Sequence, residues 1–245
     1  MGSKSKSCAL MSIVLLAISS CLWPAGKVTS KSVQSSVVTQ FNPQAYEDIP
    51  PGEGRVFWID GQASEVHVFV WRGGPLAGEG HNHVMRVAKM DGAAFLPNDM
   101  LKHQLRFDIV FPVSGIEVDP PELRHELGGA FDSGITSEGA RGTREHMLGT
   151  GVLDAQHFPT IGLSVTQAYG EPPKMALDIQ ISLHGLQRHR MVPVTISRDD
   201  GEIRVSGSFV IEQSDFGIKP FSALEGALYI QDPIMIQFNV VGRSH

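Results

Sequence analysis

Two histidines two residues apart, His81 and His83, are the strongest candidates for chemistry in this sequence. Alternate residues of an extended strand face the same side, so both imidazoles could bind one Zn²⁺ or Cu²⁺. The sequence identifies no third ligand, because nothing in it brings His184 or His189 close to the pair. The alternative interpretation is a histidine pair that hydrogen-bonds strand ends or the mouth of a barrel.

The motifs of common hydrolases and nucleotide-binding enzymes are absent from the sequence. It contains no G-x-S-x-G, no H-E-x-x-H and no G-x-x-x-x-G-K-S. Ser214 and Asp215 could be drawn into a triad with a distant histidine, but short polar side chains at such a place more often cap a turn. We therefore expect no enzyme activity, no catalytic residue and no cofactor.

The N-terminus has the pattern of a secretory signal over residues 1–20. Lys4 and Lys6 precede a short apolar run from Ala9 to Ile18, which is too short to span a bilayer comfortably. The segment Ile18-Ser19-Ser20-Cys21 resembles the bacterial lipobox, in which the cysteine thiol receives a diacylglycerol. The alternative is ordinary cleavage near Ser19 or Ser20, which would leave Cys21 unmodified. Either alternative predicts export to the periplasm or the outer cell envelope.

Residues 21–52 are rich in Ser, Thr, Val, Gln and Pro without sustained periodicity, which predicts a flexible tether. A folded domain is expected from 53 to 242. The organising stretch of that domain is 175–218, where apolar and polar residues alternate over 177–183, 192–196 and 203–211. A polar break at 184–189 separates the first two strands, and Asp199-Asp200-Gly201 predicts a hairpin between the last two.

The remaining alternating segments bring the expected count to about nine strands. They lie at 55–60, 65–71, 84–95 (around a turn at 90–92), 105–111, 159–169 and 233–241. In 65–71 both faces are apolar, so one can meet an interior and the other a neighbouring segment. The stretch 119–151 contains Pro120-Pro121, several glycines and mixed charges, and predicts one or two short helices across an opening. We expect Arg144 and Glu145 in this stretch to form a structural bridge that holds the helical segment to the sheet; the alternative is a functional charge pair at a ligand portal.

Four elements in order resemble the YceI-like family of polyisoprenoid-binding proteins. Listed along the chain, they are R-E-H-M-L at 144–148, D-A-Q-H-F-P-T-I at 154–161, H-G-L-Q-R at 184–188 with V-P-V at 192–194, and S-D-F-G-I at 214–218. The resemblance covers roughly residues 55–241. Family members often have a histidine near 81–83, but the H-N-H form departs from their commonest pattern, so the correspondence of either histidine stays open.

The resemblance implies an all-β fold, a single antiparallel lipocalin-like β-barrel of about eight strands with one or two short helices near an opening. It also implies a long prenyl chain, such as a quinone tail or a polyprenyl lipid, as the ligand. Such a barrel can be filled by side chains or hold one slender ligand. Mid-strand Gly207 favours a hollow interior, although a bulge would explain it equally well.

The residues expected to line an apolar cavity are the inward apolar positions of the predicted strands. They are Phe107, Ile109, Leu177, Ile179, Ile181, Ile203, Val205, Phe209, Ile211, Ile236 and Phe238.

Charge and composition limit the partners. The net charge is −6, and the first twenty residues contribute two lysines and no acid, so a processed chain would be more acidic still. Nucleic acid is not an expected partner, because phosphate binding needs a basic surface. The expected partners are an isoprenoid lipid and a membrane reached through a lipidated Cys21, and an edge strand could pair two copies of the chain. The alternative function is that of a periplasmic metal-binding or stress-response protein using His81 and His83.

Overall fold

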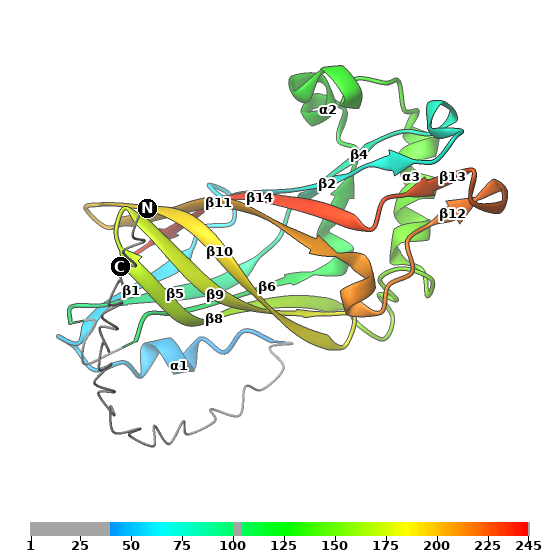
Figure 1. Ribbon diagram of the computed structural model, residues 1–245. Coiled ribbons are helices and arrows are strands. Elements are labelled where there is room, and N and C mark those ends of the chain that lie inside the picture. The colour runs from blue at the N-terminus through cyan, green and yellow to red at the C-terminus, as the bar shows by residue number, and fades with distance from the viewer. Residues whose placement is uncertain (1–39, 100–103, 245) are drawn as a thin grey trace, which may run out of the picture. The chain divides into compact units, whose positions relative to one another are not determined.

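Eight antiparallel strands that follow one another along the chain form a closed barrel (Figure 1). The computed structural model describes residues 40–99 and 104–244, all within one compact unit. Five barrel strands are continuous: β8 (Thr160–Glu171), β9 (Lys174–Leu183), β10 (Leu186–Asp199), β11 (Glu202–Glu212) and β14 (Pro233–Arg243). The ring closes where β14 pairs with β1. The predicted all-β barrel is therefore confirmed.

The other three barrel strands are each broken into two segments. They consist of β1 (Gly54–Ile59) with β2 (Glu65–Val70), β4 (His83–Val87) with β5 (Asp91–Pro97), and β6 (Arg106–Pro112) with β7 (Ile116–Val118). The breaks lie side by side, since the Ala88 N–H donates to the Gly115 carbonyl at 3.1 Å. This explains why nine predicted strands give eight barrel strands: 55–60 and 65–71 are two parts of one.

The predicted turn at 90–92 is wrong. Asp91 and Gly92 belong to β5 and pair with Val110 and Ile109 of β6. The segments β4 and β5 do not pair with each other, because β4 adds to β2 while β5 adds to β1. Residues 88–90 are therefore a kink within one barrel strand and not the end of a hairpin.

Two tight turns join the strands of the central meander. Asp199 pairs with Glu202 around a two-residue turn in which Gly201 has φ +78°, which confirms the predicted hairpin. The polar break predicted at 184–189 is shorter than expected, because His184 and Gly185 alone form the turn, with φ of +51° and +74°. Two successive positive φ values suit the right-handed twist of a hairpin. The polar residues after Gly185 consequently belong to β10.

The segment between β7 and β8 contains α2 (Pro121–Leu127), the 3-10 turn η3 (Gly129–Phe131) and α3 (Ser137–Leu148). Leu123 of α2 packs on the outer face of the barrel against Phe69 and Val84. Helix α3 instead contributes Thr143, His146 and Met147 to the wall of the interior. The prediction of short helices near an opening thus fits α3, whereas α2 covers the outside of β2 and β4.

A small second sheet stands beside α3 at one end of the barrel (Figure 1). It consists of β12 (Ser222–Ala223), β13 (Leu228–Ile230) and β3 (Arg72–Gly73). The 3-10 turns η1 (Ala77–Glu79), η4 (Gln213–Phe216) and η5 (Leu224–Gly226) connect this region, and η2 (Val113–Gly115) separates β6 from β7.

Residues 40–52 pack on the outside of the barrel, which corrects the predicted extent of the tether. Tyr46 of α1 (Gln44–Glu47) is buried in a cluster with Phe41 and Trp58, and its hydroxyl donates to Asp108 Oδ2 at 2.7 Å. Burial and the nearby Asp108 charge raise the pKa of the Tyr46 phenol well above its usual value. Aromatic side chains in this segment thus hold residues 40–52 against the barrel. The predicted signal peptide, Cys21 and residues 21–39 of the tether lie outside the described residues.

We predict that Tyr46→Ala lowers the free energy of unfolding by about 3 kcal/mol, because it removes a large buried aromatic side chain. Tyr46→Phe should cost about 1 kcal/mol through the lost hydrogen bond to Asp108. Urea unfolding followed by circular dichroism measures both. Glu47→Ala, at an exposed position of the same helix, is the control and should change stability by less than about 0.5 kcal/mol. Wild-type stability in Tyr46→Ala would contradict the docking of this segment.

Candidate functional site

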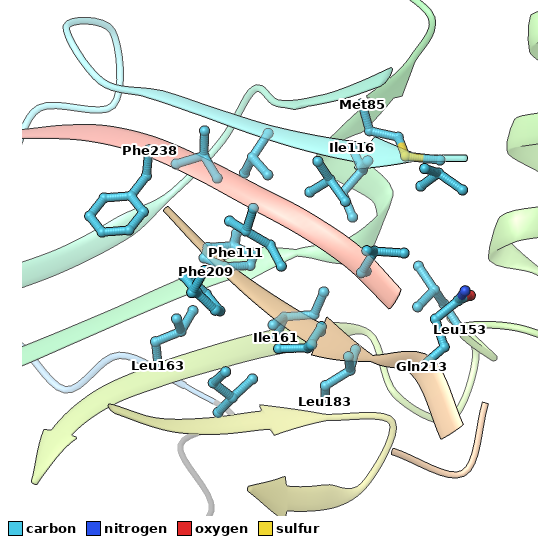
Figure 2. Close-up of a pocket in the computed structure, with 18 of the residues that line it drawn as sticks. Met85, Phe111, Ile116, Leu153, Ile161, Leu163, Leu183, Phe209, Gln213 and Phe238 are labelled. Carbon is cyan, nitrogen blue, oxygen red and sulfur yellow. The ribbon is translucent and has the colours of Figure 1, made fainter. Parts of the chain in front are cut away.

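The interior of the barrel contains a cavity of about 610 Å³. This volume falls within the range of about 300–1,000 Å³ typical of ligand pockets. Figure 2 shows branched aliphatic and aromatic side chains around it, from Phe238 and Leu163 at one end to Leu153 and Gln213 at the other. The site is therefore a long apolar chamber.

All eleven residues predicted to line a cavity lie on its wall. They are Phe107 and Ile109 of β6, Leu177, Ile179 and Ile181 of β9, Ile203, Val205, Phe209 and Ile211 of β11, and Ile236 and Phe238 of β14. The period-two pattern brings them together, because alternate side chains of every barrel strand point inward. Contact between these residues and a ligand remains a prediction.

Gly207 makes room for an aromatic ring. The register between β11 and β14 is regular from Glu202 to Glu212, so there is no bulge at this glycine. A Cβ at Gly207 would lie 2.9 Å from the Phe238 ring and 2.8 Å from the Pro193 carbonyl oxygen. Neither sequence interpretation is complete: the position faces inward, but the space it leaves is covered by Phe238.

Sequence reasoning missed the part of the wall beyond the strand breaks. Val66, Val68 and Val70 of β2 line the cavity, as do Met85 of β4 and Met147 of α3. The alternation of the three valines could have identified them as inward residues. Nothing in the local sequence indicated Phe221 or the residues of β13, because the small sheet places them at the cavity by long-range pairing.

The polar side chains of the cavity wall belong to the end nearest the small sheet. They are Arg72, His81, His83, Thr143, His146, Gln213 and Tyr229. Their proximity follows from the pairings Val70↔His83 and Arg72↔Ile230, and from the contact of the His146 and Phe221 rings at 4.9 Å. Among the described residues that line the cavity there is no aspartate or glutamate. The chamber is thus apolar along its length, and its polar side chains gather at the end nearest the small sheet, which we call the mouth.

His83 is held by a buried ionic network. Its Nδ1 lies 2.7 Å from Asp119 Oδ2, while Asp119 Oδ1 accepts from Arg124 Nη1 at 2.6 Å and from the Val84 N–H at 3.1 Å. The Asp119 side chain is fully buried and that of Arg124 is 6% exposed. Burial alone would raise the pKa of Asp119, but the His83 and Val84 hydrogen bonds and the Arg124 charge outweigh it and hold that pKa below its usual value. Asp119 is therefore an ionised carboxylate that fixes the His83 ring.

Among the residues that the structure describes, no third metal ligand lies beside the two histidines. His81 Nδ1 contacts Ser133 Oγ at 3.2 Å, whereas His184 contacts the Phe216 carbonyl and His189 contacts Asp178. Within residues 40–99 and 104–244, no group of three His, Cys, Asp or Glu side chains could hold a metal ion. The geometry therefore favours the hydrogen-bonding interpretation of the pair.

Two further pairs of neighbouring polar residues that the sequence singled out have separate partners in the structure. Arg144 donates to the carbonyl oxygens of Ser114 and Ile116 and so ties α3 to the barrel, but Glu145 pairs with Arg141. Arg144 therefore makes the predicted structural bridge, whereas Glu145 takes part in an ion pair within α3. Ser214 contacts Asp232, and Asp215 forms an ion pair with Arg190.

A model of the YceI-like domain family matches residues 58–242, which is most of the chain. This chain belongs to the YceI-like domain family. The resemblance of its four sequence elements is thereby confirmed. No curated protein matches this YceI-like chain.

Two solved structures resemble the YceI-like barrel. BcnA of Burkholderia cenocepacia has 14% identity and a TM-score of 0.53, with 75% of this chain and 98% of that chain covered. A polyisoprenoid-binding domain from Saccharophagus degradans, implicated in plant cell wall breakdown, has 12% identity and a TM-score of 0.51, with 77% and 98% covered. At these identities the likeness supports the fold alone.

We predict that Asp119→Asn lowers the free energy of unfolding at pH 7 by about 3–5 kcal/mol, because Arg124 loses its buried counter-charge. Since the folded-state pKa of Asp119 is depressed, its contribution is complete above the ordinary carboxyl pKa and is lost as the pH falls below about 4. Urea unfolding at pH 7, 5 and 3 should show the gap between wild type and variant narrowing at the lowest pH. Asp132→Asn, at an exposed carboxylate, is the control. A gap that stays constant with pH would contradict the ionic role.

Proposed function

We propose that this YceI-like protein binds, stores or carries a polyisoprenoid lipid, with the hydrophobic chain inside the barrel. The observation that carries the proposal is the cavity of about 610 Å³, whose wall is aliphatic and aromatic except at one end. Burial of a prenyl chain there would be favourable by about 0.8 kcal/mol per CH₂ group, which can exceed the cost of ordering the chain. The description of the Saccharophagus degradans domain as polyisoprenoid-binding supports the same ligand class.

The proposed role requires binding and release, with no catalytic step. Specificity would come from the length and shape of the chain, because the wall offers few polar groups. A quinone tail and a polyprenyl lipid both satisfy this requirement.

We further propose that the protein acts in the bacterial cell envelope, held at a membrane by a lipidated Cys21. The sequence pattern of residues 1–21 supports this proposal. Among the described residues no helix is long and apolar enough to cross a membrane. A lipid anchor would keep the barrel near the bilayer in which isoprenoid lipids reside.

Native mass spectrometry of the full chain purified from bacteria, followed by extraction into organic solvent, tests the ligand class. We expect one prenyl lipid per chain. An empty protein that also fails to take up an added prenyl quinone would contradict the proposal.

A variant pair localises that lipid. Ile236→Trp fills the cavity from β14 and should reduce bound lipid at least tenfold with little loss of stability. Val210→Trp, at a half-exposed outward position next to the inward Phe209, is the matched control and should retain the lipid. Equal lipid content in the two variants would place the lipid elsewhere.

Metabolic labelling with a palmitate analogue tests the anchor. We expect label on the wild-type chain and none on Cys21→Ala, which should also leave the membrane fraction, because it loses the two acyl chains of the diacylglycerol. Wild-type protein without label would indicate ordinary cleavage, and label that persists in the variant would place the lipid on another residue; either result contradicts an anchor at Cys21.

A further inference from the structure

Both histidines that line the cavity mouth have Nδ1 engaged by a neighbouring side chain, although His81 is exposed and His83 is partly buried. Residues 83, 85 and 87 of β4 line the cavity, so His83 faces inward as Met85 and Val87 do. Nδ1 of His83 is engaged by Asp119, and Nδ1 of His81 by Ser133. In each ring the nitrogen left for another partner is Nε2.

The supports of both rings belong to one buried unit. Arg124 Nη2 contacts the Ser133 carbonyl and hydroxyl oxygens at 3.0 Å each, and Arg124 Nη1 contacts the Asn82 carbonyl at 2.9 Å as well as Asp119. One guanidinium therefore fixes the carboxylate behind His83, the serine behind His81 and the backbone between them. Burial of such a network is costly unless every group is satisfied.

The charge of the mouth selects what the rings would meet. Arg72 lies on the same inward face, two residues beyond Val70, and His146 of α3 also lines the cavity. No carboxylate of the described residues shares this wall, although the chain as a whole carries a net charge of −6. The only nearby carboxylate that the network uses, Asp119, is neutralised from behind by Arg124. The mouth thus offers a ligand the positive charge of Arg72 and, where the Ser133 hydroxyl donates to His81 Nδ1, an N–H donor at His81 Nε2. A neutral His83 donates its Nδ1–H to Asp119, so its Nε2 is an acceptor.

From this juxtaposition we infer that the mouth is a head-group site, in which His81 and Arg72 donate hydrogen bonds to the oxygens of an isoprenoid head group and His83 Nε2 accepts one from a head-group hydroxyl. This inference rests on the proposed function, because the tail must occupy the chamber. A phosphate monoester fits this site, because its oxygens accept, its charge complements Arg72 and its remaining P–OH can donate to His83. A quinone offers acceptor oxygens only and therefore cannot use His83.

Three ligands that share a C20 isoprenoid skeleton test the inference: geranylgeranyl monophosphate, menaquinone-4 and the saturated hydrocarbon phytane. Dissociation constants are measured on the full chain by competition with a fluorescent polyene. We expect at least one headed ligand to bind tenfold or more tightly than phytane, and the tighter of the two identifies the head.

The decisive variant is His83→Asn, whose amide can still donate to Asp119 but has nothing at the Nε2 position. It should weaken the preferred headed ligand about tenfold and leave phytane binding and the urea midpoint unchanged. His67→Asn on the outer face of β2 is the matched control and should bind all three ligands as the wild type does. Thermal unfolding of each variant verifies that the chain is folded.

Three results would overturn the inference. Equal affinity of wild type for headed and headless chains would show that the mouth does not bind the head. Stoichiometric zinc that is bound by wild type and lost in His83→Asn would assign the histidines to a metal. Failure of the wild type to bind any of the three chains would remove the proposed function, and the head-group site with it.

Discussion

Closure of the sheet between β14 and β1 is the constraint on which the rest of the structure depends. The pairing is short, Trp58 with Arg243 and Ile59 with Gly242, and an ion pair of 2.8 Å between Arg243 and Asp60 reinforces it. Ser64 adds to it, because its hydroxyl accepts from the Val241 N–H at 2.9 Å. A closed ring has no edge there for another strand, and its inward side chains must share one interior. The hydrogen-bonded strands of this closed sheet hold the walls of the chamber apart.

The walls and the mouth follow opposite physical rules. Aliphatic side chains that line a chamber of about 610 Å³ gain contacts from an apolar occupant, which therefore favours the folded chain. The polar groups behind the mouth are instead engaged with one another, since Asp119 and Arg124 bond to each other and to backbone groups of Asn82 and Val84. The interior thus combines a wall that gains from an apolar guest with a rim already ordered before any guest arrives.

The sequence predicted the barrel and its inward face well, because alternation over 177–183 or 203–211 is a local signal that long strands preserve. The sequence predicted poorly where the barrel strands are broken into two segments. The kink at 88–90 was mistaken for a hairpin turn, because Asp-Gly also occurs at the start of β5. It also missed the Asp119–His83–Arg124 network, whose members are up to 41 positions apart and meet only through the pairing of β4 with β7. The docking of Tyr46 was missed for the same reason, since Asp108 lies far along the chain.

The three side-by-side breaks also constrain which changes of length the barrel tolerates. Inward residues are odd-numbered before each break and even-numbered after it: Phe57 precedes Val66, Val87 precedes Ala94, and Phe111 precedes Ile116. Each break therefore contains the number of residues that restores the inner face after the bend. One residue more or fewer would turn Val66 and its alternates outward and bring Phe69 inside, because a strand has a period of two. Surface loops commonly drift in length among relatives, but these three bends can change their amino acids far more freely than their residue count.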